Sequence, residues 1–236
     1  MTMRAVILAG GRGRRLLPYT TVLPKPLMPI GDQPILEVVI RQLQAAGFAR
    51  ITLAVGHLSG LIQAFFGDGA RWGVAIDYAL EDQPLGTAGP LGSIPGLDEP
   101  FLLMNGDLLC DLDYADLHRV HLQRGDVATV AVYEKEVQLS LGVLELDEQE
   151  RIVGYREKPT LRYPVSTGIY CLSPRVLAYV APGRHLDLPE LITTLVRAEE
   201  QVSAYRFTGY WLDIGRPEDY EVALELFGRA PESFLR

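Results

Sequence analysis

The chain has 236 residues, 48% hydrophobic and 22% charged, with a formal net charge of −8 at pH 7. This composition is typical of a globular protein with a sizeable core and excludes a disordered or fibrous chain. The acidic balance disfavours general binding to nucleic acid or anionic membranes, so any phosphate must be bound by a local cluster of positive charge.

The N-terminus does not have the pattern of a targeting or membrane-spanning segment. The apolar run in MTMRAVILAGG is too short for a signal peptide, and no run approaches the ~18 apolar residues of a membrane span. Two cysteines, Cys110 and Cys171, are too few for a disulfide framework and are typical of free thiols in a reducing compartment. We therefore expect a cytoplasmic protein that binds neither membrane nor nucleic acid.

The first half of the chain alternates short apolar runs with segments of helical periodicity. Strands are predicted at 4–9, 50–56, 73–80, 100–107 and 127–134. Helices are predicted at 34–47, 59–69 and 113–125, with a weak one at 86–94. This alternation predicts an α/β fold with a doubly wound, mostly parallel, Rossmann-like sheet.

The pattern changes near residue 140. Two strands joined by a turn are predicted within 141–159, then a strand at 166–174, short helices at 174–180 and 189–199, an extended segment at 201–215 and a final helix at 216–228. We interpret this half as a smaller β-rich lobe inserted at the edge of the sheet. The chain 1–236 is thus predicted to be one domain, with lobes at 1–135 and 136–215 followed by a C-terminal helix at 216–236.

Polar residues follow three of the predicted strands. Gly10–Arg15 follows the first, Glu81 with Gly86 and Thr87 follows the third, and Asn105-Gly106-Asp107 ends the fourth. Ligands of such sheets bind at the carboxyl ends of the strands. The sequence therefore predicts a site at this edge.

The segment GGRGRR at 10–15 suits a phosphate. Glycines let backbone N–H groups approach a phosphate closely, and three arginines within four residues would repel one another without an anion. The spacing of a P-loop is absent, and so is the third glycine of a dinucleotide-binding fingerprint. An ordinary glycine turn is the alternative reading.

Lys25 lies between two prolines, which stiffen the backbone around it. A second lysine, Lys158, also precedes a proline, in Glu157-Lys158-Pro159. An ammonium is a compact point charge that suits a phosphoryl oxygen. We predict that Lys25 neutralises phosphate rather than lying free on the surface.

Asp107, at the tip of an apolar strand, suits a Mg²⁺ that keeps waters and is completed by substrate phosphates. The alternative is a turn or capping aspartate, a role that Asp111 and Asp113 fit better. Asp213, before a glycine and a helix start, is a candidate second ligand. The histidines show no metal-ligand spacing, and His118 and His121 are expected to be surface residues of one helix face.

The stretch GGRGRRLLPYTTVLPKPLMPI resembles the signature of sugar-1-phosphate nucleotidylyltransferases. EDQPLGTAG, MNGDLLCDLD, EKP, STGIY and YWLDIGRPEDY follow in the family's order, so the resemblance covers nearly the whole chain. It implies that a sugar 1-phosphate attacks the α-phosphorus of an NTP, releasing pyrophosphate and forming an NDP-sugar. The nucleophile is already ionised, so catalysis would depend on positioning and charge stabilisation rather than on a general base.

The resemblance also implies residue roles. It makes 1–135 the nucleotide-binding lobe and 136–215 the sugar-binding lobe, with Arg15, Lys25, Asp107 and Asp213 catalytic and the two aspartates holding Mg²⁺. The implied nucleotide-binding residues are Leu8, Ala9, Gly10, Gly11, Arg12, Gly13, Glu81, Gly86 and Thr87. The implied sugar-phosphate-binding residues are Asn105, Gly106, Gly142, Glu157, Lys158, Thr167 and Gly168. Arg14 stands where the family often has threonine and receives no role.

The sequence constrains the base of the NTP less than it constrains the reaction. Glu81 stands where thymidylyl and uridylyl relatives have glutamine, and a carboxylate only accepts hydrogen bonds, as the N1–H and N2–H₂ groups of guanine require. GTP is therefore favoured, as in mannose-1-phosphate guanylyltransferases, with UTP, dTTP and CTP as alternatives. Asp82 or Gln83 could occupy the same position instead. Mannose, manno-heptose and hexosamine 1-phosphates all remain open.

Two further expectations concern assembly and activity. Relatives form dimers and tetramers, which implies a homo-oligomer, and the chain ends too soon after the final helix for the extra C-terminal domains of some relatives. The competing function is a catalytically silent paralogue that binds nucleotide sugars as a regulatory subunit. Loss of Arg15, Lys25 or an aspartate would favour that reading, and all are present.

Overall fold

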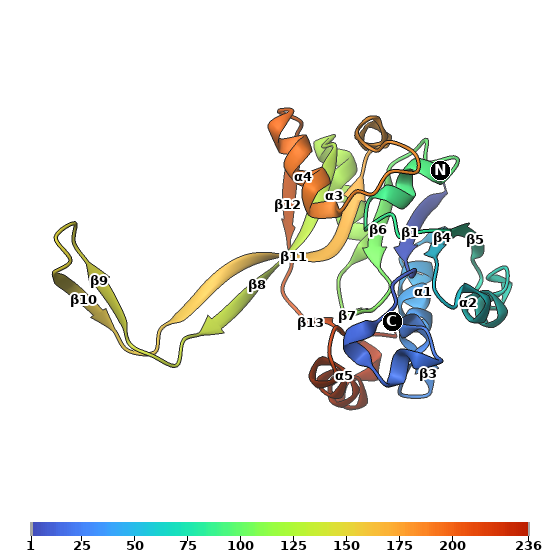
Figure 1. The fold of residues 1–236 in the computed structure, drawn as a ribbon. Helices are drawn as coiled ribbons and strands as arrows, with labels where there is room; N and C mark the ends of the chain where they lie inside the picture. Colours follow the sequence, from blue (N-terminus) through green and yellow to red (C-terminus); the bar gives the residue numbers. More distant parts are fainter. Residues whose placement is uncertain (1, 236) are drawn as a thin grey trace.

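The computed structural model describes residues 2–235, with a seven-stranded sheet at its centre (Figure 1). The strands are β1 (Met3–Leu8), β2 (Pro29–Ile30), β3 (Gln33–Pro34), β4 (Phe48–Val55), β5 (Ala75–Leu80), β6 (Phe101–Asn105), β7 (Leu108–Cys110), β8 (Ala128–Gln138), β9 (Val143–Leu146), β10 (Ile152–Arg156), β11 (Thr160–Leu172), β12 (Val202–Arg206) and β13 (Trp211–Asp213). The α-helices are α1 (Ile35–Ala45), α2 (Ser59–Phe66), α3 (Tyr114–Arg124), α4 (Leu188–Arg197) and α5 (Pro217–Arg229).

The central sheet has the order β12-β8-β11-β6-β1-β4-β5. β1 pairs in parallel with β4 and β6, β4 with β5, and β12 with β8, whereas β11 runs antiparallel to both of its neighbours. The prediction of a mostly parallel α/β sheet is confirmed. The carboxyl ends of β1, β4, β5 and β6 consequently lie along one edge.

β1 illustrates why both faces of this sheet are covered. Successive side chains of a strand point to opposite faces, so a continuous apolar run is expected where both faces are buried. Ala5 and Ile7 pack in one core cluster with residues of α1, α2 and α3, whereas Val6 packs in another with residues of α4. A third cluster lies beneath α5.

Several predicted elements differ from the structure in type or length, and two of them show why. The segment at 86–94 contains only a 3-10 helix, Gly89–Ser93, because its glycines and proline disfavour an α-helix. The strand expected at 166–174 is the end of the longer β11, which starts at Thr160. Its first half pairs with β8 outside the apolar core, where the sequence carries no continuous apolar run.

The expectation that His118 and His121 lie on the surface is wrong. Both are buried on the inner face of α3, where His121 Nδ1 lies 2.8 Å from Thr129 Oγ1. Burial lowers the pKa of His121 to about 4. The sequence of α3 does not indicate this burial, because Thr129, whose hydroxyl pairs with the imidazole, lies on β8.

Residues 136–163 form a projecting arm (Figure 1). It consists of the distal parts of β8 and β11, which pair from Thr160↔Gln138 inward, and of the hairpin β9–β10 beyond them. The segment is β-rich, as expected, but it leaves the sheet from its second and third strands, β8 and β11, and the rest of the region predicted as a lobe contributes β11 and β12 to the central sheet itself. The arm is an extended two-stranded ribbon rather than a packed lobe.

A search of the described residues for a helix long and apolar enough to cross a membrane finds none.

Candidate active site

A cavity of about 660 Å³ lies at the carboxyl edge of the central sheet. The segments after β1, β4, β5 and β6 line it, as the strand order requires. The predicted site residues among its lining are Leu8, Ala9, Gly10, Gly11, Arg12, Gly13, Arg15, Lys25, Glu81, Gly86, Thr87, Asn105 and Asp107. The structure thus brings together polar residues that are far apart in the chain.

The loop after β1 packs tightly on neighbouring strand ends. A Cβ placed on Gly10 would lie 3.2 Å from the backbone nitrogen of Gly56 and 2.9 Å from Glu81 Oε1. Gly13 has φ +59°, and its carbonyl accepts hydrogen bonds from Leu16 N and from Thr20 Oγ1. Side chains at these positions would displace the loop, because a Cβ at Gly10 would meet Glu81 and the Gly56 backbone and one at Gly13 would meet the methyl group of Thr20 at 2.8 Å.

The arginines of this loop are uncompensated. None of Arg12, Arg14 and Arg15 forms an ion pair with any residue in the described range 2–235. The Arg15 guanidinium lies beside Gly215, its Nη1 3.3 Å from where a Cβ would be. The loop therefore offers positive charge to an anion in the cavity.

Lys25 lies in a 3-10 turn, Lys25–Leu27, and is buried. Its ammonium forms an ion pair with Asp107 and lies 4.0 Å from Asp213 Oδ1. The two carboxylates converge because β13 pairs antiparallel with β7, which sets Asp213 opposite Leu108, next to Asp107. Lys25, Asp107 and Asp213 are far apart in the sequence, and the fold brings their charged groups together.

The two aspartates are not fully satisfied by Lys25. Asp107 Oδ1 is buried and has no hydrogen-bond partner among the described residues. Burial, together with the neighbouring charge of Asp107, raises the pKa of Asp213, and Lys25 and Arg15 oppose this shift. A carboxylate oxygen without a donor fits a cation ligand, and any cation here would take its remaining ligands from water or from phosphate.

Glu81 begins a segment that closes one side of the cavity. Its Oε2 accepts a hydrogen bond from Leu85 N at 3.2 Å, and burial raises its pKa. Thr87 holds the far end, because its N–H donates to Asp187 and its hydroxyl accepts from Leu188 N at 2.7 Å. Gly86, at φ +78°, would place a Cβ 2.6 Å from the carbonyl of Leu186.

A second group of predicted residues adjoins Asn105. Gly168 has φ +77° and would place a Cβ 2.6 Å from Asn105 Nδ2. Thr167 is buried; its hydroxyl donates to the Ala131 carbonyl, and its own carbonyl accepts from Trp211 Nε1 at 3.0 Å. Gly106 donates its N–H to the Leu8 carbonyl. Of this group only Asn105 lines the cavity; Gly106, Thr167 and Gly168 are not among the lining residues, and Gly168 lies behind Asn105.

The structure does not bring Gly142, Glu157 and Lys158 to the cavity. All three lie in the arm, where Tyr155 Oη donates to Glu157 Oε2 at 2.8 Å and Lys158 Nζ lies 4.0 Å from Glu157 Oε1. Their distance from the cavity follows from the pairing of β8 with β11, which carries the hairpin outward. The sugar-binding role of these three residues stays a prediction.

The cavity is also lined by residues that received no predicted role, among them Gly56 and His57 after β4. Gly56 accommodates Gly10, whose carbonyl lies 3.2 Å from where a Gly56 Cβ would be. The signal in the sequence is the glycine that ends the apolar strand RITLAVG. Arg14, Pro26, Asp82, Gln83, Pro84 and Gly215 complete the lining.

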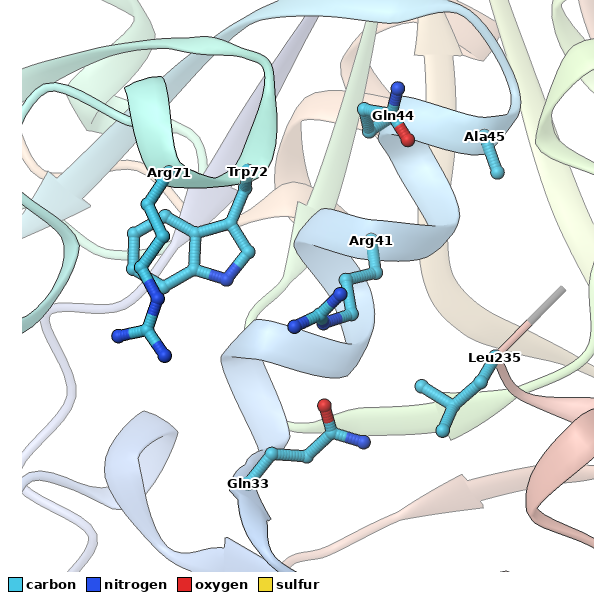
Figure 2. Close-up of a pocket in the computed structure, with 7 residues that line it drawn as sticks. All are labelled: Gln33, Arg41, Gln44, Ala45, Arg71, Trp72 and Leu235. Carbon is cyan, nitrogen blue, oxygen red and sulfur yellow. The ribbon is translucent and has the colours of Figure 1, made fainter.

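A smaller cavity of about 330 Å³ lies between α1 and the turn after α2 (Figure 2). Arg41, Arg71, Gln33, Gln44 and the indole of Trp72 line it, and the Arg71 guanidinium lies 5.2 Å from the Trp72 ring centroid. It contains no carboxylate and no glycine loop. It therefore lacks the combination of groups present in the larger cavity.

Comparisons with known proteins show the family to which the chain belongs. The model of the nucleotidyl transferase family matches residues 4–227. A UTP–glucose-1-phosphate uridylyltransferase from Synechocystis sp. is 35% identical over 94% of this chain and 62% of its own length. Mannose-1-phosphate guanyltransferase beta-B from Xenopus laevis is 34% identical over 92% of this chain and 62% of its own length. The chain thus spans less than two thirds of these relatives.

Solved structures share the fold. HddC from Yersinia pseudotuberculosis complexed with GMP-PN is 26% identical, with a TM-score of 0.73 over 96% of this chain and 100% of that one. A putative glucose-1-phosphate thymidylyltransferase from Bacillus anthracis is 24% identical, with a TM-score of 0.78 over 95% of both chains.

Proposed function

Because the chain belongs to the nucleotidyl transferase family, we propose that it transfers a nucleotidyl group from an NTP to a sugar 1-phosphate. The observation that carries this proposal is the convergence of Lys25, Asp107 and Asp213 beside an uncompensated arginine loop. The names of relatives, which include uridylyl, guanyl and thymidylyl transferases of sugar phosphates, support the same reaction class.

The reaction requires positioning more than proton transfer. An oxygen of the sugar phosphate, already ionised, forms a new bond to the α-phosphorus, and the bond from that phosphorus to the pyrophosphate oxygen breaks. Backbone N–H groups at Gly10–Gly13 orient the NTP, and Arg15 takes charge on the departing pyrophosphate. Lys25 offsets the negative charge of the two phosphates that must approach each other.

Asp107 and Asp213 would hold a Mg²⁺. The unpartnered Oδ1 of Asp107 and the nearby Asp213 carboxylate fit a hard cation that prefers oxygen ligands. The cation would supply Lewis-acid stabilisation of charge on the phosphates. Lys25, which already pairs with Asp107, would offset part of the negative charge that the two carboxylates direct towards the phosphates.

We favour GTP as the nucleotide. Glu81 lies in the cavity wall, and its carboxylate offers two acceptor oxygens, of which one accepts from Leu85. Guanine presents adjacent N–H donors, whereas uracil and thymine also present acceptors, which a carboxylate would repel. UTP, dTTP and CTP remain the alternatives, with Asp82 or Gln83 as the residue that contacts the base.

The sugar, the assembly and the location belong to the same proposal. Mannose 1-phosphate is the first candidate, followed by manno-heptose and hexosamine 1-phosphates. The protein would act in the cytoplasm, where Cys110 and Cys171, both buried and free, stay reduced, and it would form a homo-oligomer.

The test is a pyrophosphate-release assay with purified protein, Mg²⁺, four NTPs and a panel of sugar 1-phosphates. We expect turnover with GTP and at least one sugar 1-phosphate. Binding of an NDP-sugar without turnover of any pair would instead support the catalytically silent paralogue. Retention of Arg15, Lys25, Asp107 and Asp213 favours the enzyme.

A further inference from the structure

Helix α4 begins with a cap that comes from a distant segment. Asp187 stands at the N-cap position, where an aspartate side chain ordinarily accepts a hydrogen bond from the first turn of its own helix. Within the described residues it makes no such bond. The N–H of Leu188 instead donates at 2.7 Å to the hydroxyl of Thr87, which lies 101 positions earlier in the chain. The Asp187 carboxylate is therefore available to another segment.

That segment is the part of the cavity wall that ends at Thr87. The Oδ1 atom of Asp187 accepts a hydrogen bond from Thr87 N at 3.0 Å, and the Thr87 hydroxyl lies 3.3 Å from the same oxygen. Each side chain thus satisfies a backbone N–H group of the other segment, as a cap does within a single helix. The exchange joins two segments that are 100 residues apart.

Backbone hydrogen bonds continue this junction. Leu186 N donates to the Leu85 carbonyl at 2.9 Å, and the Leu186 carbonyl accepts from Gly89 N at 3.0 Å. The contact is close, because a Cβ at Gly86 would lie 2.6 Å from the carbonyl oxygen of Leu186. Residues 85–89 are therefore packed directly on the chain that leads into α4 (Figure 1).

The junction also positions Glu81. Leu85 N donates to Glu81 Oε2 at 3.2 Å, and the carbonyl of the same Leu85 is held by Leu186. Residues 82–84, between Glu81 and Leu85, are exposed and line the cavity. Their position depends on the anchors at each end, because an exposed segment has little packing of its own.

From this geometry we propose that Asp187 is a positioning residue of the nucleotide site, a role that rests on the proposed function. Asp187 is not among the residues that line the cavity. It acts by holding Gly86 and Thr87, and through Leu85 the carboxylate of Glu81, in the arrangement that receives the base of the NTP. The segment is then ordered before the NTP arrives, so binding does not bear the entropic cost of ordering it.

The first experiment measures the junction without any ligand. Amide hydrogen exchange of the intact chain, followed by mass spectrometry, should be at least ~10-fold faster at residues 85–89 in Asp187→Ala than in the wild type. Asp113→Ala is the matched control, because Asp113 Oδ1 accepts from Asp116 N at 2.9 Å and this variant also loses an aspartate cap, on α3. It should leave exchange at 85–89 unchanged. Unchanged exchange in Asp187→Ala, or an equal rise in Asp113→Ala, overturns the proposal.

The second experiment separates binding of the NTP from the chemical step. At saturating sugar 1-phosphate, Asp187→Ala should raise KM for the NTP that the wild type uses about 10-fold and change kcat less than ~3-fold. Asp187→Asn keeps an acceptor oxygen and should bring KM back to within ~3-fold of the wild type. Asp113→Ala should change neither constant.

A purely structural role of Asp187 would give a different result. An unchanged KM in Asp187→Ala, or a KM that Asp187→Asn does not restore, overturns the proposal; circular dichroism checks that each variant is folded. If the wild type turns over no pair of substrates, the proposed function fails, while hydrogen exchange still decides whether Asp187 holds residues 85–89.

Discussion

The cavity and the arm begin at the same edge of one sheet, yet they are stabilised in different ways. Around the cavity, strand ends are buried on both faces, and loops such as Gly10–Gly13 are held by several neighbouring segments. In the arm, two strands pair only with each other, and their apolar side chains are exposed. The packed strand ends around the cavity can hold catalytic groups at fixed distances. The exposed apolar side chains of the arm are suited to contact with a partner.

The largest expected effect concerns the carboxylate at the centre of the cavity. Asp107→Asn should lower kcat about 10³-fold, because it removes the anionic partner of Lys25 and the unpartnered oxygen that suits a cation. Mg²⁺-dependent pyrophosphate release measures this effect. Asp32→Asn, outside the larger cavity, is the control, and a fully active Asp107→Asn would contradict the assigned role.

Lys25 should not tolerate arginine. The side chain is buried between two prolines, and a planar guanidinium is larger than the ammonium that now contacts the two aspartates. Lys25→Arg should lower kcat about 10²-fold, whereas Lys135→Arg, on the exposed part of β8, should leave it unchanged. Near-full activity of Lys25→Arg would show that a point charge is not required.

His121 should make the core sensitive to acid. Its pKa is lowered to about 4 by burial, so the unfolded chain takes up the proton first as the pH falls below the ordinary value. The neutral, buried imidazole of His121 therefore stabilises the fold by on the order of 2 kcal/mol above about pH 6.5, and this stabilisation is lost as the pH falls towards 4. Urea unfolding at several pH values measures it. His121→Asn should flatten this dependence and the exposed His185→Asn should not; equal slopes would contradict the assignment.

The base preference should depend on Glu81. Glu81→Gln should shift the ratio of kcat/KM for GTP over UTP about 10-fold towards UTP, because an amide also donates a hydrogen bond. Asp82→Asn is the neighbouring control. If Asp82→Asn shifts the ratio and Glu81→Gln does not, the contact with the base belongs to Asp82.

The smallest effect distinguishes two adjacent glycines. Gly10→Ala should lower the free energy of unfolding by about 1 kcal/mol, because its Cβ would meet Gly56 and Glu81. A Cβ at Gly11 would meet no heavy atom within 4 Å, so Gly11→Ala should leave stability unchanged. Thermal unfolding compares the two; equal losses would mean that the loop is not packed as described.

Much of the core could be predicted from the sequence because burial on both faces leaves continuous apolar runs, as in Arg4–Ala9. The edge where the strand ends meet follows from parallel pairing, which explains why Gly10, Glu81 and Asp107 could be grouped beforehand. Three features could not be predicted. The burial of His121 depends on Thr129, Gly56 lines the cavity only because β4 lies next to β1, and the outward course of the arm depends on where β8 pairs with β11. Each is a contact between distant segments, which local periodicity does not report.

In the proposed reaction the sugar phosphate itself attacks the α-phosphorus. Turnover of a sugar 1-phosphate labelled with ¹⁸O in its phosphate, with mass spectrometry of both products, tests this directly. We expect all of the label to remain in the NDP-sugar and none to enter pyrophosphate. Label in pyrophosphate, or an NDP-sugar that has lost labelled oxygen, would contradict it.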